Sequence, residues 1–167
     1  MADAEIIVLT FKEGLLSRVA HDLKLRAESV VVVAVGDTVE VTVDARSLRV
    51  VCAMADGRES HGTLSAADMR KIEHNLVEDV LAAARYPTIS FRSDPLRPGV
   101  VSGALTLHGV TRRVTAPAHR AADLWTARFD LHQPDFGIRP YSAMMGALRV
   151  RPDVQVHVAV GHREEWI

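Results

Sequence analysis

The sequence contains few aromatic residues, a single cysteine and almost no net charge, and each shortage excludes a class of protein. Phe, Trp and Tyr make up only 5% of the 167 residues, so Val, Leu, Ile and Ala must build the core, and the β-branched residues among them favour strands. Cys52 has no second cysteine for an internal disulfide, and we expect it to be a small buried core residue. A net charge of −1 does not attract phosphate backbones, so we expect no nucleic-acid partner.

Long apolar runs and an export signal are also missing from the sequence. The start of the chain, Met1–Glu5, is acidic, and the apolar run 6–9 is too short for a signal or membrane segment. We therefore expect a cytoplasmic protein without stable membrane insertion. The composition, 48% hydrophobic and 25% charged residues without a Gly/Ser linker or repeat, predicts one domain over residues 1–167.

Five segments alternate apolar and polar residues, a pattern typical of strands with one dry face and one wet face. They span residues 39–44, 89–93, 101–108, 125–132 and 154–160. Turn residues separate consecutive segments at Gly36-Asp37, Pro98-Gly99 and Gly109. Adding strands near 5–11 and 23–35 predicts a mainly β fold, an antiparallel barrel of about eight strands. A barrel of that size is filled by its own side chains or holds one small ligand.

One segment breaks the strand pattern and predicts an amphipathic helix. Met69, Ile72, Leu76 and Val80 recur at helical spacing. Ser65 is suited to cap the start of this helix, and Pro87 stops its continuation. A second, short helical turn is predicted over residues 13–20.

The polar residues do not form a pattern typical of a metal or catalytic site. His108, His132 and His157 fall on the polar phase of their strands, and none belongs to a paired ligand motif. His21 beside Asp22 suggests a general base, but neighbouring strand residues point to opposite faces. Nucleophile elbows and glycine-rich phosphate loops are absent. We therefore expect no metal, no cofactor and no catalysis, with an enzyme acting on a small apolar substrate through His21 and Asp22 as a minor alternative.

Four segments resemble the YceI family of lipocalin-like, polyisoprenoid-binding proteins. They are 41–48 (VTVDARSL), 84–93 (ARYPTISFRS), 105–112 (LTLHGVTR) and 135–138 (DFGI). The resemblance implies a lipocalin-like barrel whose lumen binds, stores or transports an isoprenoid or fatty-acid-like lipid. The segments 54–61 and 13–22 depart from the family's pattern, and the chain is similar to a cytoplasmic branch without a signal peptide.

Under this interpretation, inward apolar side chains line the lumen and polar side chains at its mouth meet a head group. The predicted lining is Leu16, Val19, Leu23, Leu25, Val41, Val43, Phe91, Leu105, Leu107, Val114, Phe129, Leu131, Phe136 and Ile138. The predicted head-group residues are Arg18, His21, Arg139 and Tyr141. The alternative is a non-catalytic structural or interaction barrel, with a homodimer among its forms, in which the same apolar residues fill the interior.

Overall fold

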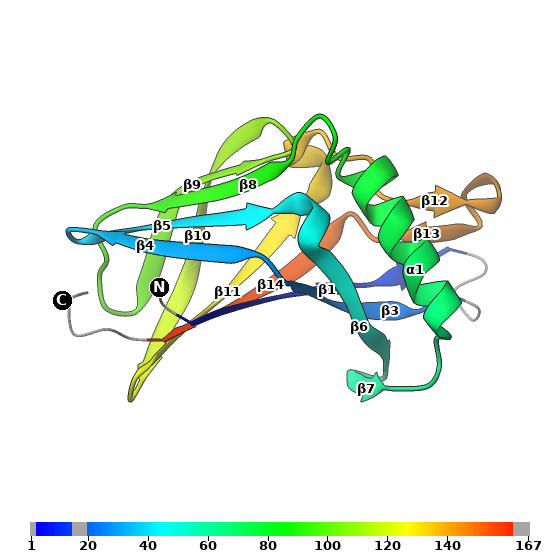
Figure 1. Cartoon of the computed structure of the whole chain (residues 1–167), viewed down its shortest axis with the longest axis horizontal. Helices are drawn as coiled ribbons and strands as arrows, with labels where there is room; N and C mark the ends of the chain where they lie inside the picture. The colour runs from blue at the N-terminus through cyan, green and yellow to red at the C-terminus, as the bar shows by residue number, and fades with distance from the viewer. Residues whose placement is uncertain (1–2, 15–19, 162–167) are drawn as a thin grey trace.

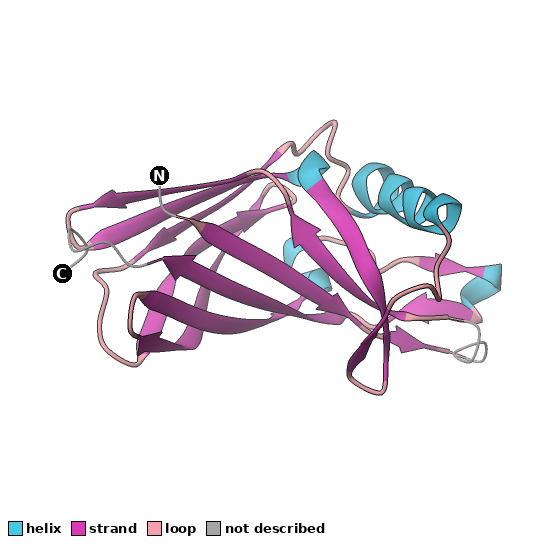
Figure 2. Ribbon diagram, turned by 60° about the horizontal axis from the view of Figure 1, so that its bottom comes forward, coloured by secondary structure: helices cyan, strands magenta, loops and turns pink. Residues whose placement is uncertain are grey.

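The computed structural model describes residues 3–14 and 20–161, and antiparallel strands dominate it (Figures 1 and 2). The strands are β1 (Ala4–Thr10), β2 (Lys12–Glu13), β3 (Asp22–Ala27), β4 (Val30–Val35), β5 (Thr38–Asp44), β6 (Leu48–Ala55), β7 (Arg58–Ser60), β8 (Thr88–Ser93), β9 (Val100–Leu107), β10 (Val110–Ala121), β11 (Leu124–His132), β12 (Ser142–Ala143), β13 (Leu148–Val150) and β14 (Asp153–Gly161). The helical segments are α1 (Ala66–Asn75), the π-helical η2 (Leu76–Val80), and the 3-10 turns η1 (Ala45–Ser47), η3 (Gln133–Phe136) and η4 (Met144–Gly146).

The main sheet curls into a barrel because the chain connects the two ends of the sheet twice. Its hydrogen-bonded order is β4-β5-β8-β9-β10-β11-β14-β1-β3-β6-β7, and a small sheet β12-β13-β2 lies beside it. The chain passes from β3 into β4, and from β5 through η1 into β6, so it crosses from one end of that order to the other twice. Backbone bonds from Glu28 N to Ser47 O (3.1 Å) and from Asp44 N to Ser29 O (3.2 Å) hold the two crossings together.

The predicted mainly β, barrel-like fold is confirmed, with a larger number of strands than expected. If β3–β4 and β5–β6 each count as one bent arm, the barrel has eight arms among the described residues. The described residues nevertheless form fourteen strands, because those two arms are broken and the short strands β2, β7, β12 and β13 are added. The alternation of apolar and polar residues predicts the long arms but not the breaks within them.

Two tight turns occur where the sequence predicts them. Val35 pairs with Thr38 across Gly36-Asp37, and Leu107 pairs with Val110 across His108-Gly109. His108 and Gly109 both have positive φ angles, 53° and 73°, which is the conformation that closes a two-residue hairpin. His108 is therefore a turn residue rather than the strand residue that the alternation indicates.

The predicted amphipathic helix is α1, and it covers one end of the barrel (Figure 1). Ser65 caps it in a reciprocal capping box with Asp68. Met69, Ile72 and Leu76 pack against the core cluster, and the Glu73 carboxylate accepts a bond of 2.9 Å from the backbone N of Val50 on β6. The second predicted helical turn is not found at its start, because Lys12–Glu13 forms β2; residues 15–19 lie outside the described residues.

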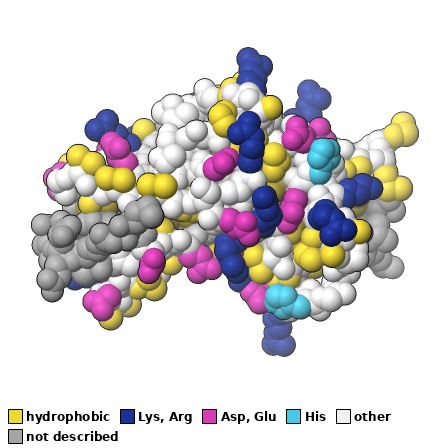
Figure 3. Space-filling model, viewed as in Figure 1, with side chains coloured by type: hydrophobic (Ala, Val, Ile, Leu, Met, Phe, Trp, Pro, Cys, Tyr) yellow, Lys and Arg dark blue, Asp and Glu magenta, His cyan; other side chains and the backbone are white. Residues whose placement is uncertain are grey.

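The outer face of β4 carries an apolar row. Val31, Val33 and Val35 are 42%, 48% and 48% exposed, whereas Val32 between them is 4% exposed. Figure 3 shows apolar atoms along this part of the surface. Within the described residues, no helix is long and apolar enough to cross a membrane.

Candidate functional site: an apolar cavity in the barrel

An apolar cavity of about 270 Å³ lies inside the barrel. Ten of the fourteen predicted lining residues form part of its wall: Leu25, Val41, Val43, Phe91, Leu105, Leu107, Val114, Phe129, Leu131 and Ile138. Leu23 and Phe136 pack in or against the adjoining core cluster instead. Leu16 and Val19 lie outside the described residues. Contact between any of these side chains and a ligand stays a prediction.

Strand register explains why the alternating residues meet in one wall. Val8 lies opposite both Leu25 and Val156, and Val156 lies opposite Phe129. These four residues come from four neighbouring strands and share one face, because paired residues in an antiparallel sheet point to the same side. The sequence-based list omits β1 and β14, although Ile6, Val8 and the valines of β14 line the cavity. The alternating pattern of residues 154–160 was the sequence signal that the valines of β14 share one face.

An aromatic pair forms part of the cavity wall. The rings of Phe91 and Phe129 meet edge to face, with their centroids 5.9 Å apart. The Phe91 ring lies over Gly103 on the neighbouring strand, where an added Cβ would come within 2.8 Å of the ring and 2.3 Å of the Arg92 carbonyl oxygen. Glycine at position 103 therefore sets how closely Phe91 approaches the wall.

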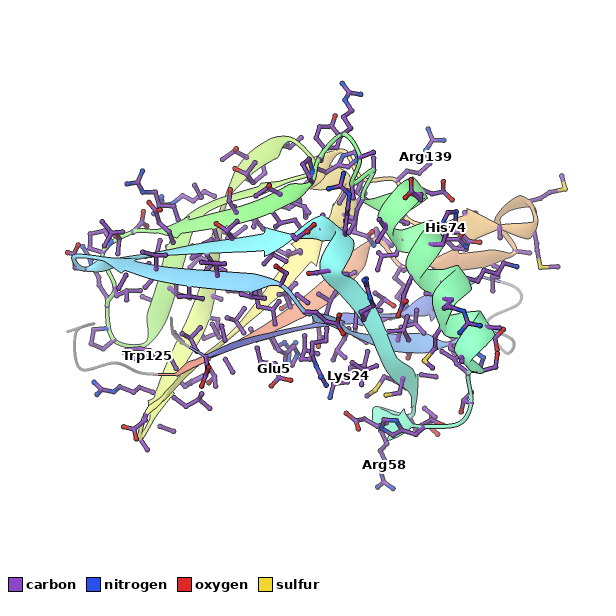
Figure 4. All side chains as sticks on the ribbon, viewed as in Figure 1. Glu5, Lys24, Arg58, His74, Trp125 and Arg139 are labelled. Atoms are coloured by element: carbon purple, nitrogen blue, oxygen red, sulfur yellow. The ribbon has the colours of Figure 1, made fainter. Side chains whose placement is uncertain are left out.

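The exposure of the wall residues distinguishes a closed end from an open end. Beneath α1, Leu25, Leu81 and Ile138 are at most 7% exposed. At the opposite end, Arg97 of the β8–β9 connection and Val100 at the start of β9 are exposed. Figure 4 shows Trp125, another wall residue, at this end of the barrel and far from α1. Among the described residues, the cavity wall is therefore exposed at the β8–β9 connection and buried beneath α1.

Arg97 is the single charged residue in the described part of the cavity wall. It makes no ion pair with any described residue, whereas nearby Arg92 and Arg113 are paired with Glu40 and Asp94. The sequence analysis missed Arg97, because an arginine beside the Pro98-Gly99 turn carries no pattern that marks a cavity entrance.

The predicted head-group residues that the structure describes lie outside the cavity wall. None of His21, Arg139 and Tyr141 belongs to the cavity wall, and Arg18 lies outside the described residues. Arg139 is exposed near α1 (Figure 4), and the Tyr141 hydroxyl accepts a long bond of 3.4 Å from Asn75 Nδ2. A head-group role for these residues stays a prediction.

The arrangement around His21 does not support the catalytic alternative. The Asp22 carboxylate accepts a bond of 2.8 Å from the backbone N of Lys12, which fixes β2 against β3. Within the described residues, no hydrogen bond joins His21 to Asp22. The carboxylate therefore has a structural partner and does not orient the imidazole.

Three of the four segments that carry the family resemblance meet at the closed end. The His108 and Tyr86 rings lie 4.6 Å apart, and His108 Nδ1 lies 3.2 Å from the carbonyl oxygen of Phe136. Arg112 Nε donates a bond of 3.0 Å to the carbonyl oxygen of Asp135. These contacts fix η3, so that buried Phe136 and Ile138 close the base of the barrel. The motif residues thus shape the cavity by closing one end.

Comparison with known proteins gives one family and several related structures. Residues 10–161 match the family model described as a YceI-like domain. No similar sequence was found among curated proteins.

The related structures share the fold at low sequence identity. Burkholderia cenocepacia BcnA has a TM-score of 0.66 and 14% identity, covering 96% of this chain and 98% of its own. A polyisoprenoid-binding domain from Saccharophagus degradans, implicated in plant cell wall breakdown, has a TM-score of 0.62 and 12% identity, covering 97% of both chains. The Campylobacter jejuni YCEI protein has a TM-score of 0.56 and 14% identity, covering 87% of this chain and 88% of its own.

Proposed function

Because the chain belongs to the YceI-like family, we propose that its barrel binds a long apolar molecule, an isoprenoid or fatty-acid-like lipid, for storage or transport. The observation that carries this proposal is the cavity of about 270 Å³ walled by valine, leucine and isoleucine side chains. Its volume lies just below the range for small-molecule sites, roughly 300–1,000 Å³, which favours a narrow chain over a bulky ring system. The name of the Saccharophagus degradans domain is consistent with this ligand class.

Burial of the ligand's hydrocarbon chain supplies the affinity. Each methylene that leaves water contributes about 0.8 kcal/mol, so ten methylenes contribute about 8 kcal/mol before the costs of association. Such binding requires no catalytic group and no cofactor. The proposal therefore describes residues 1–167 as one non-catalytic binding domain, with a cytoplasmic location expected from the sequence.

The open end of the cavity determines where a polar head group would lie. A ligand that enters beside the β8–β9 connection places its tail beneath α1 and its head group near Arg97 and Trp125. The Arg97 guanidinium has no ion pair among the described residues and can bind a carboxylate or phosphate. We therefore propose Arg97 as an additional head-group residue, and a role for Arg18, His21, Arg139 and Tyr141 stays a prediction.

Displacement of a fluorescent long-chain fatty acid from the purified chain tests the proposal. Leu107→Trp places an indole ring in the cavity wall. If the ring displaces roughly two methylenes of the fatty acid, binding should weaken at least tenfold. Val33→Trp is the matched control, because Val33 lies on the outer face of β4. Equal affinity of both variants and the wild type would refute the position of the binding site.

A second candidate function is an interaction barrel that forms a homodimer. One observation favours it, the exposed valines of β4. This strand is an edge of the main sheet, and apolar edge strands pair readily with another chain. Sedimentation of the wild type and of Val33→Lys tests it: a dimer that the lysine dissociates supports this candidate, and a monomeric wild type contradicts it.

A further inference from the structure

The β6–β7 hairpin brings a thiol, an imidazole and a carboxylate together on the outside of the barrel. Asp56 and Gly57 have positive φ angles of 50° and 75° and close a two-residue turn, so that Met54 pairs with Glu59 and Ala53 with Ser60. Cys52 and His61 directly follow the last of these pairs, and their side-chain ligand atoms lie within 4.8 Å of each other. Glu59 and His61 are two residues apart and share a face. A spacing of six residues between Cys52 and Glu59 gives no ligand motif in the sequence, and the turn is what brings the groups together.

The three potential ligand atoms lie close enough to share one ion. The Cys52 sulfur, a Glu59 oxygen and a His61 ring nitrogen all lie within 4.8 Å of one another, and His61 Nε2 is 3.0 Å from Glu59 Oε2. Ligand atoms around a tetrahedral zinc ion are about 3.5 Å apart, so small side-chain rotations would complete the geometry.

The positions of the three side chains suit an ion bound from outside. Cys52 is 3% exposed, whereas the His61 and Glu59 side chains are 64% and 43% exposed. The thiol therefore forms the floor of the cluster, and the two exposed side chains lie on its solvent side. None of the three residues belongs to the wall of the lipid cavity, so this cluster is independent of the proposed lipid site.

We propose that Cys52, Glu59 and His61 bind a divalent transition-metal ion of the zinc class, with solvent as the fourth ligand. Thiolate, imidazole and carboxylate together are the donor set that such an ion prefers, whereas magnesium and calcium select oxygen ligands alone. On binding, the thiol releases its proton to solvent and the sulfur bonds the metal.

Lys24 is the group that competes with the ion. It lies opposite Cys52 on β3, and its ammonium group pairs with Glu59 Oε1. Metal binding requires this ammonium group to move away from the carboxylate, and the Lys24 side chain, 23% exposed, projects from the outer side of β3 (Figure 4). The lysine is therefore expected to lower the affinity without blocking the site.

Cobalt(II) titration of the full chain tests this proposal, because a cobalt–thiolate bond gives a charge-transfer band in the near ultraviolet. One equivalent of cobalt is expected to produce the band, and zinc is expected to abolish it. Cys52→Ala should eliminate the band, and His61→Gln should weaken cobalt binding at least about tenfold. Lys24→Met should strengthen binding, since it removes the competing charge.

A matched control separates this site from general surface binding. His132 also lies beside a carboxylate, with Nδ1 2.7 Å from Asp153 Oδ1, but has no cysteine close by, so His132→Gln should leave the titration unchanged. His61 is exposed and its replacement leaves the core intact, so the test does not depend on the folding of Cys52→Ala. The absence of a charge-transfer band in the wild type would overturn the proposal, as would equal cobalt affinity of His61→Gln and wild type.

Discussion

Gly103→Ala tests how the wall of the cavity is built. The added methyl group would lie 2.3 Å from the Arg92 carbonyl oxygen and 2.8 Å from the Phe91 ring, both well below contact distance. Because Phe91 lines the cavity, we expect the ring to turn into it, and the backbone of β8 must also shift. Overpacking of this kind costs about 1–3 kcal/mol, and the displaced ring would occupy space that a lipid chain needs.

The assay is a double-mutant cycle with Phe91→Leu, measured by urea unfolding and by binding of the fluorescent fatty acid. Phe91→Leu removes the ring that collides with the new methyl group, so the double variant should be more stable than the sum of the single effects predicts. Part of the loss should remain, because the contact with the Arg92 carbonyl persists. Strictly additive effects, or a Gly103→Ala variant that binds the fatty acid as the wild type does, would refute this description of the wall.

Three further predictions concern single side chains. Arg97→Gln should weaken binding of a fatty acid by about 1 kcal/mol or more, the scale of a charge-assisted hydrogen bond. Binding of the fatty alcohol of the same chain length should not change. Equal losses for the acid and the alcohol would show that Arg97 does not bind the head group. Burial, followed by the charge of Arg128, lowers the pKa of His157 below its usual 6.5. The folded state therefore binds this proton less readily than the unfolded chain, and the free energy of unfolding should fall as the pH drops below about 6.5. His157→Gln should reduce this pH dependence, measured by urea denaturation at a series of pH values. The same pH dependence in the variant and the wild type would contradict the assignment. Ser65→Ala should cost about 0.5–2 kcal/mol in thermal unfolding by removing the cap of α1, and an unaltered melting temperature would show that the cap is dispensable.

The barrel was predictable because alternation and turn chemistry act locally. Leu105 and Leu107 share a face by period alone, and Gly109 permits the turn that returns the chain alongside them. The breaks in the arms were not predictable, because they depend on contacts across the barrel such as that between Glu28 and Ser47. Alternation shows which side chains face inward but not whether they meet, so the choice between a cavity and a filled core required the structure.

The position of the polar groups depends on three-dimensional arrangement more than on sequence. His21 and Tyr141 were predicted to meet a head group, but neither belongs to the described cavity wall. The Cys52 cluster was missed because the histidines were tested only for ligands at close spacing. The Asp56-Gly57 turn was the available signal, since it closes the hairpin that pairs Met54 with Glu59 and Ala53 with Ser60, next to Cys52 and His61.

Native mass spectrometry of the purified chain, followed by solvent extraction, tests the central claim most directly. The account predicts an added mass that belongs to an extractable apolar molecule, is replaced by an added fatty acid, and is absent from Leu107→Trp but present in Val33→Trp. A wild-type chain that carries no extractable lipid and binds no long-chain probe would contradict the claim that the cavity is a lipid site.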